Sequence, residues 1–375
     1  MFRKYVSNTS CGTGTNYILE FKENRRFTAR AYFKCAVTGR LNHRFFYMNQ
    51  VNSTYSDGSV AYRNKPGGNW KILRAVIADG GEIGPLNVEA GELVNPTPVT
   101  FDGRAEKTVA PCEKFWSDEV TFDLPENHYL VWEWEIEGNG IPCTPDSQVP
   151  TFMDYGPGMK FDYFCPMPAL IGIERPETLP AKKRVAFLGD SITQGCQTTL
   201  NAYAMWVGKI AAMLAPDYPV WNIGLGFARG SDAATDDCWL WKAKQMDVVV
   251  LTCGVNDVLS GEYQAGRPST AGEIIGWLEK TVRALKEAGV DVIISKIPPY
   301  EMNQRSYEEW RAANLAIPAV AALYGCKVYD IESSLDASAV LESRYLYNAH
   351  PDDNGGTAAA EKFKATFLTQ YGWNL

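Results

Sequence analysis

The second half of the chain alternates short apolar runs with longer segments of helical period, and no other feature restricts its fold as strongly. Strands are predicted at about residues 185–189, 219–223, 247–253, 291–297 and 326–331, and helices at about 201–214, 272–288, 304–324 and 356–370. Strands that alternate with helices build a mostly parallel sheet with helices on both of its faces. The pattern therefore predicts an α/β fold, a three-layer αβα sandwich, over residues 184–375.

The first 165 residues follow a different pattern. Short alternating or aromatic-rich runs, such as 26–37 and 129–136, are separated by turn residues such as those at 66–68. This arrangement is typical of an antiparallel all-β sandwich, and we expect a jelly-roll-like domain over residues 1–165. Proline-rich residues 166–183 are predicted to be a linker between the two domains.

The composition argues against several classes of protein. The chain has 375 residues, of which 46% are hydrophobic and 21% charged, as in an ordinary globular protein large enough for two domains. Its net charge of −8 and the lack of a basic stripe argue against nucleic-acid binding, and no apolar segment approaches the ~20 residues of a membrane span. Nine cysteines without Cys-x-x-Cys pairs suggest reduced thiols, and we expect no metal and no cofactor. The amino terminus lacks an apolar signal region, which favours a cytoplasmic protein, or a secreted one if a signal has been trimmed from this sequence.

A serine and a histidine are the candidate reactive residues. The apolar run 185–189 stops at Gly-Asp-Ser, which places Ser191 at the carboxyl end of a parallel strand, where open α/β sheets have their crevice. A serine hydroxyl needs a base, usually histidine. His43 and His128 lie in the β-rich half, so His350, in a polar loop before the last helix, is the candidate base. Each residue alone has a plainer explanation, a helix cap for the serine and a structural or solvated side chain for the histidine.

Two further segments follow predicted strands. The run 247–253 leads into Gly-Val-Asn-Asp, where the side-chain NH2 of Asn256 could point into the same crevice and stabilise an oxyanion. Residues 224–230 form a glycine-rich turn, and glycines allow a backbone to approach a ligand and offer its N–H groups.

Taken in order, Gly-Asp-Ser, the glycine turn, Gly-Val-Asn-Asp and a late His-Pro resemble the four sequence blocks of the SGNH/GDSL hydrolase superfamily. The resemblance covers roughly residues 184–370. It implies that Ser191 is the nucleophile and donates one backbone N–H to the oxyanion hole, that Asn256 is another donor, and that His350 is the base. Several sugar esterases of this superfamily carry a β-sandwich before the catalytic domain, so the two-domain arrangement is also similar.

The chain departs from the family pattern at two positions. Phe227 occupies the usual glycine position of the turn, and we assign the backbone oxyanion donor to the neighbouring Gly226. Tyr347 occupies the slot of the Asp that normally orients the histidine. This suggests a Ser-His dyad, in which a backbone carbonyl, Asn348 or a carboxylate from elsewhere holds the imidazole. The alternative is a damaged, inactive site.

The expected activity is that of a serine ester hydrolase. The resemblance implies removal of a small acyl group, acetyl in the first place, from a small-molecule or oligosaccharide ester through an acyl-enzyme. A lysophospholipase or thioesterase is the alternative within this class. Two other classes remain open, an inactive carbohydrate-binding module and a nucleotide binder suggested by the glycines of 224–230, although the third glycine comes one residue late. We expect no nucleic-acid or membrane partner, and the sequence leaves the oligomeric state open.

Overall fold

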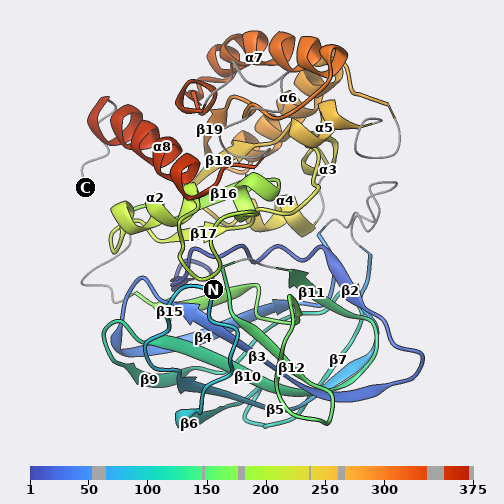
Figure 1. The fold of residues 1–375 in the computed structure, drawn as a ribbon, viewed down its shortest axis with the longest axis vertical. Coiled ribbons are helices and arrows are strands. Elements are labelled where there is room, and N and C mark those ends of the chain that lie inside the picture. Colours follow the sequence, from blue (N-terminus) through green and yellow to red (C-terminus); the bar gives the residue numbers. More distant parts are fainter. Residues whose placement is uncertain are drawn as a thin grey trace.

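The computed structural model of the chain describes residues 1–52, 65–145, 148–175, 182–235, 238–260, 267–335 and 350–370. Figure 1 shows the two halves of the chain one above the other, with the β-sheets of the first half at the bottom and an α/β unit at the top. The expected fold class, an SGNH-type α/β sandwich preceded by an all-β sandwich, is confirmed.

Two antiparallel sheets form most of the first half. One has the strand order β1-β15-β4-β8 with β9 also paired to β4, and the other has the order β13-β12-β3-β10-β5-β6 with β7 also paired to β5. A small third sheet has the order β14-β11-β2. The strands are β1 (Tyr5–Ser7), β2 (Tyr17–Leu19), β3 (Arg25–Lys34), β4 (Gly39–Met48), β5 (Trp70–Asp79), β6 (Val94–Val99), β7 (Lys107–Val109), β8 (Lys114–Trp116), β9 (Val120–Leu124), β10 (Tyr129–Gly138), β11 (Ile141–Pro145), β12 (Thr151–Asp154), β13 (Lys160–Phe161), β14 (Phe164–Cys165) and β15 (Leu170–Glu174).

Aromatic side chains fill the space between the two large sheets. Trp132 and Trp134 project from β10 toward Phe45 and Tyr47 on β4, with ring centroids 4.5 Å apart for Phe45 and Trp132 and 5.3 Å apart for Tyr47 and Trp134. All four side chains are buried. Aromatic pairs at such distances add to the apolar area removed from water. The aromatic-rich runs that include these residues therefore build the core and are not open sugar-binding platforms.

Part of the predicted linker belongs to the sandwich. Residues 170–174 form β15, which pairs with β1 on one side and β4 on the other, so the prediction of a linker over this part of 166–183 is wrong. The physical reason is that Leu170, Ile171 and Ile173 are apolar and fully buried between neighbouring strands. The prolines that suggested a linker stand on either side of this strand.

The second half contains a five-stranded parallel sheet in the order β17-β16-β18-β19-β20. A 3₁₀ turn covers Glu332–Ser334, and a π-helical segment, Lys364–Gln370, follows the last α-helix. The strands are β16 (Val185–Gly189), β17 (Val220–Asn222), β18 (Val248–Thr252), β19 (Asp291–Ser295) and β20 (Lys327–Tyr329), and the helices are α1 (Ser191–Gln194), α2 (Trp206–Leu214), α3 (Gly230–Ala233), α4 (Cys238–Ala243), α5 (Val255–Leu259), α6 (Ala271–Glu287), α7 (Gln304–Tyr324) and α8 (Asp353–Phe363).

Alternate residues of the central strand pack on opposite faces of this sheet. On β16, Phe187 contacts Trp206 of α2 and Phe363 of α8, with ring centroids 5.1 and 6.1 Å apart. Ala186 and Leu188 belong to a second apolar cluster that contains side chains of α4, α6 and α7. The period of two along the strand thus explains both the three layers and the continuous apolar run in the sequence.

The sandwich packs directly against the edge strand of the parallel sheet. Trp221 on β17 donates its Nε1–H to Thr13 Oγ1 at 2.9 Å and to the Ala169 carbonyl oxygen at 2.8 Å. Phe2 stacks on the same indole at 5.6 Å, and the Thr13 N–H donates to the Asn222 carbonyl oxygen at 3.0 Å. The two halves therefore share buried contacts. None of the helices in the described parts of the chain is both long and apolar enough to cross a membrane.

Candidate active site

Ser191 stands at a sharp turn between strand and helix. β16 ends at Gly189, and a Cβ atom there would lie 2.2 Å from Thr193 Oγ1 and 2.5 Å from the Thr252 carbonyl oxygen, so only glycine fits. Asp190 then caps α1 by accepting the Ile192 N–H at 3.0 Å. Ser191 follows as the first helical residue and is partly exposed at the carboxyl edge of the sheet.

The structure brings Ser191 and His350 together. His350 Nε2 lies 2.8 Å from Ser191 Oγ, although the two residues are 159 positions apart in the chain. Asp352, two residues after the histidine, caps α8 by accepting the N–H groups of Asn354 and Gly355. The first turn of α8 thus fixes the end of the segment that carries the imidazole. The other two histidines lie in the sandwich, where His43 is fully buried on β4 and His128 pairs with Asp79 at 2.8 Å.

Tyr300 contacts the second nitrogen of the imidazole, which the sequence analysis did not foresee. Its hydroxyl oxygen lies 3.3 Å from His350 Nδ1, and the two rings meet edge to face at 5.3 Å. If Nε2 is to accept the serine proton, Nδ1 carries the hydrogen and donates it to this hydroxyl oxygen. No carboxylate of the described residues pairs with His350. Tyr347 and Asn348, which the sequence analysis considered, lie outside the described residues.

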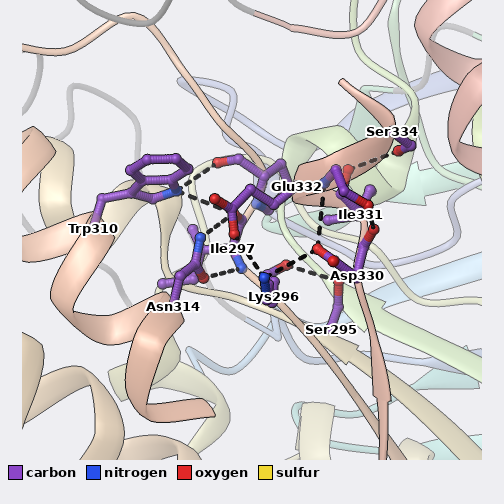
Figure 2. Close-up of polar contacts among 11 residues, drawn as sticks. Ser295, Lys296, Ile297, Trp310, Asn314, Asp330, Ile331, Glu332 and Ser334 are labelled. Carbon is purple, nitrogen blue, oxygen red and sulfur yellow. Dashed lines mark hydrogen bonds and ion pairs between the residues drawn. The ribbon is translucent and has the colours of Figure 1, made fainter. Parts of the chain in front are cut away.

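A buried hydrogen-bond network fixes the chain that leads to Tyr300 (Figure 2). Asn314 on α7 accepts the Ile297 N–H at 2.7 Å and donates to the Ile297 carbonyl oxygen at 3.0 Å. Trp310 donates its Nε1–H to the same carbonyl at 3.0 Å and to that of Pro298 at 3.1 Å. Because backbone groups on both sides of Ile297 are held, the loop after β19 has a defined path, which places the phenol beside the histidine.

Burial sets the charge of the histidine. It lowers the pKa of His350 from 6.5 to about 4, because the imidazolium ion loses its water shell in this position. The side chain is therefore neutral at physiological pH, as a base that takes a proton from serine must be. A carboxylate beside Nδ1 would act in the opposite direction and raise this pKa.

Asn256 contacts the glycine turn through its side chain. It lies in the first turn of α5, the helix that begins directly after Gly254. The φ of Gly254 is +135°, a backbone conformation that favours glycine. Its Nδ2 donates to the Ala228 carbonyl oxygen at 3.0 Å, and its side chain is only 5% exposed. An amide nitrogen carries two hydrogens, and this bond engages one of them.

The Gly226 N–H is already engaged within the protein. It donates to Gln194 Oε1 at 2.9 Å, which argues against the predicted role of Gly226 as oxyanion donor. The next residue, Phe227, has a φ of +62°, the left-handed conformation that favours glycine. Its side chain is 48% exposed, whereas Gly226 and Ala228 on either side are buried. Phe227 thus has a backbone conformation that favours glycine and adds an aromatic ring at the surface.

Residues of the sandwich support the other side of this turn. A Cβ atom on Gly14 would lie 3.0 Å from the Gly224 carbonyl oxygen, and one on Gly226 would lie 3.2 Å from Asn16 Nδ2. Asn222, just before the turn, donates from Nδ2 to the Ser10 carbonyl oxygen at 3.1 Å. The turn is therefore held between α1 and an amino-terminal segment of the first half.

Two buried acids lie behind the site. Asp257 accepts the Gly230 N–H at 2.8 Å, and Asp190 is the cap of α1 described above. Burial raises the pKa of both side chains from 3.8 to about 7, and the charge of Asp257 adds to the rise at Asp190. Near neutral pH, both carboxyl groups are therefore partly protonated. Trp206 on α2 is buried and donates its Nε1–H to the Ile192 carbonyl oxygen at 3.2 Å.

Part of the second half is similar to a known protein family. Residues 187–358 match the model of the GDSL-like lipase/acylhydrolase family. Among solved structures, a member of the lipolytic protein G-D-S-L family from Veillonella parvula is 21% identical, with a TM-score of 0.40 over 50% of this chain and 98% of that chain. An acetylxylan esterase from Geobacillus stearothermophilus is 19% identical, with a TM-score of 0.39 over 49% of this chain and 94% of that chain. No curated protein sequence matches the chain. Residues 187–358 therefore match the GDSL-like lipase/acylhydrolase family of the SGNH superfamily, and this domain is identified as a hydrolase that acts on ester bonds.

Proposed function

We propose that this protein is a serine esterase that removes a small acyl group, acetyl in the first place, from an acylated carbohydrate. The contact of 2.8 Å between Ser191 Oγ and His350 Nε2, at the carboxyl edge of a parallel sheet, is the observation that supports it most directly. A hydroxyl hydrogen-bonded to a neutral imidazole is an activated nucleophile.

The reaction proceeds in two halves. Ser191 Oγ attacks the acyl carbon while His350 Nε2 takes its proton, and the imidazolium that results donates from Nδ1 to the Tyr300 hydroxyl oxygen. His350 then gives the proton to the departing alcohol oxygen, which leaves an acyl group on Ser191. A water molecule attacks this ester, with Nε2 again as the base, and the serine regains its proton as the acid is released.

Three N–H groups hold the negative charge that develops on the acyl oxygen. We assign them to the Ser191 backbone, the side-chain amide of Asn256 and the Phe227 backbone. Phe227 replaces Gly226 in this role because Gln194 accepts the Gly226 N–H, and Phe227 follows directly with the left-handed conformation that favours glycine. Such donors act mainly on the transition state, where the charge is largest.

The surface beside the turn favours a hydrated alcohol over a lipid tail. The exposed ring of Phe227 is followed by the half-buried polar side chains of Arg229 and Ser231. Aromatic faces beside polar groups suit the apolar and hydroxyl faces of a sugar. In this proposal residues 184–375 are the catalytic domain, and the sandwich supports the turn.

Hydrolysis of p-nitrophenyl acetate tests the assignment of nucleophile and base. Ser191→Ala and His350→Ala should each lower kcat by several orders of magnitude without loss of folding, and the double variant should be no slower than either, because the two residues act as one unit. A double variant much slower than both single ones would show that they are not partners. A series of acyl chains on a fixed leaving group separates the two candidate substrates. A preference for octanoyl over acetyl in kcat/KM would favour the lysophospholipase or thioesterase.

A further inference from the structure

A cavity of about 330 Å³ lies where the sandwich meets the α/β unit. The first half contributes residues 6–10 and 34–37, and the second half contributes residues from α2 and from the segment that leads into β17. Ser191, Asn256 and His350 are not among its walls, so it is separate from the active site. Its volume falls in the range of small-molecule sites, which often lie between domains. We call it the junction cavity.

The walls of the junction cavity are largely apolar. Val6, Ala211, Tyr218 and Val220 are buried side chains that face it, and Ile173 of β15 closes one side. Such a surface binds an apolar body by removing it from water.

The charges of the junction cavity are all positive. Lys34, Arg175 and Lys209 line it, and none of its lining residues is an Asp or a Glu. The Nε–H of Arg175 is buried and has no acceptor among the described residues, and Lys209 forms no ion pair with any of them. A buried donor without an acceptor is unfavourable, and a carboxylate is the acceptor that a guanidinium binds best. The apolar walls therefore suit the apolar part of a ligand, and the positive side chains suit a negatively charged group of the same ligand.

We propose that the junction cavity binds an amphipathic carboxylate, a small molecule with an apolar body and a single negative end. The body lies against the apolar walls, and the carboxylate pairs with Arg175 and Lys209. This site differs from the esterase site in its residues and does not depend on Ser191. Because its walls come from both halves, a bound ligand stabilises their junction.

Calorimetry on the intact protein with octanoate, 1-octanol and octylammonium tests this proposal. Octanoate should bind at one saturable site and at least tenfold more tightly than octanol, and octylammonium should not bind. Arg175→Gln and Lys209→Gln should each weaken octanoate binding about tenfold or more. Lys280→Gln, which makes the same change of charge on the exposed face of α6, is the control and should leave the affinity unchanged.

A blocking variant shows where the ligand binds. Ala212 lines the junction cavity from an exposed position on α2, so Ala212→Phe should abolish octanoate binding and still fold. Ser191→Ala should keep the binding, and all the cavity variants should hydrolyse p-nitrophenyl acetate at the unliganded wild-type rate. Equal affinity for octanoate and octanol, no saturable binding, or binding that survives in Ala212→Phe would overturn the proposal.

Discussion

Replacement of Tyr300 by Phe tests the most unusual contact of the site. The variant removes the only described acceptor of the His350 Nδ1–H and leaves the edge-to-face ring contact in place. A hydrogen bond to a charged group contributes about 1.5–3 kcal/mol, and the distance of 3.3 Å favours the lower end. A loss of ~1.5 kcal/mol from the transition state lowers kcat about tenfold. This is far below the ~10⁴-fold loss that follows when the Asp of a Ser-His-Asp triad is changed to Asn.

The pH profile of kcat/KM gives a second measure of the same contact. His350 is neutral above its folded-state pKa of about 4 and protonated below it, so activity should rise as pH passes about 4 and be level near neutrality. In Tyr300→Phe this acid limb should not move upward, since no negative charge is gained. Tyr307→Phe, the same change on α7, is the control and should keep full activity.

Steady-state hydrolysis of p-nitrophenyl acetate, followed at the isosbestic wavelength of the leaving group, gives both kcat and the pH at which kcat/KM rises. An acid limb at or above pH 6.5 in the wild type would refute the reasoning, because it would require a carboxylate beside Nδ1. An unchanged kcat in Tyr300→Phe would equally refute the role of the phenol as a positioning residue.

Three further perturbations address other parts of the molecule. Asn256→Ala should lower kcat roughly 10²–10³-fold with a smaller effect on KM. A rise in KM at constant kcat would instead show that Asn256 contributes to substrate binding in the ground state. Phe227→Gly relieves a left-handed conformation that costs ~1–2 kcal/mol, so the melting temperature should not fall. The KM for acetylated sugars should rise because the exposed ring is lost. A melting temperature lowered as much as by loss of a buried phenylalanine would contradict this reasoning. Asp257 has a folded-state pKa of about 7, above its unfolded value near 3.8, so the stability of the wild type decreases as pH rises between these values. Relative to the wild type, Asp257→Asn should therefore gain stability in urea unfolding between pH 5 and pH 8, and no such difference would show that the acid is not perturbed.

Local patterns were enough to predict the strands of the second half and to indicate Ser191 and His350 as candidate reactive residues. The apolar run before Ser191 and the turn glycine at 189 determine a strand and a sharp turn within ten residues, so no knowledge of distant packing was needed. The polar loop with His350 was found by elimination among three histidines. Short helices such as α3 and α5 have too few residues to show a helical period.

The partners of these residues could not be predicted in the same way. Tyr300 reaches His350 because α7 holds the loop after β19, and no pattern near either residue records that packing. Gln194 likewise accepts an N–H from a residue 32 positions later, which only the folded turn makes possible. Side-chain contacts between distant segments depend on the tertiary arrangement, whereas strands and turns depend mainly on neighbouring residues.

The buried junction at Trp221 has a consequence for the stability of the whole chain. Phe2 stacks on its indole ring, and the indole N–H donates to Thr13 and Ala169. Three separate segments of the first half therefore contact one residue of the parallel sheet. Loss of the sandwich would expose Trp221 and leave its Nε1–H without these acceptors, and loss of the parallel sheet would remove this donor from Thr13 and Ala169. We therefore expect the two halves to be thermodynamically linked and to unfold in one cooperative transition.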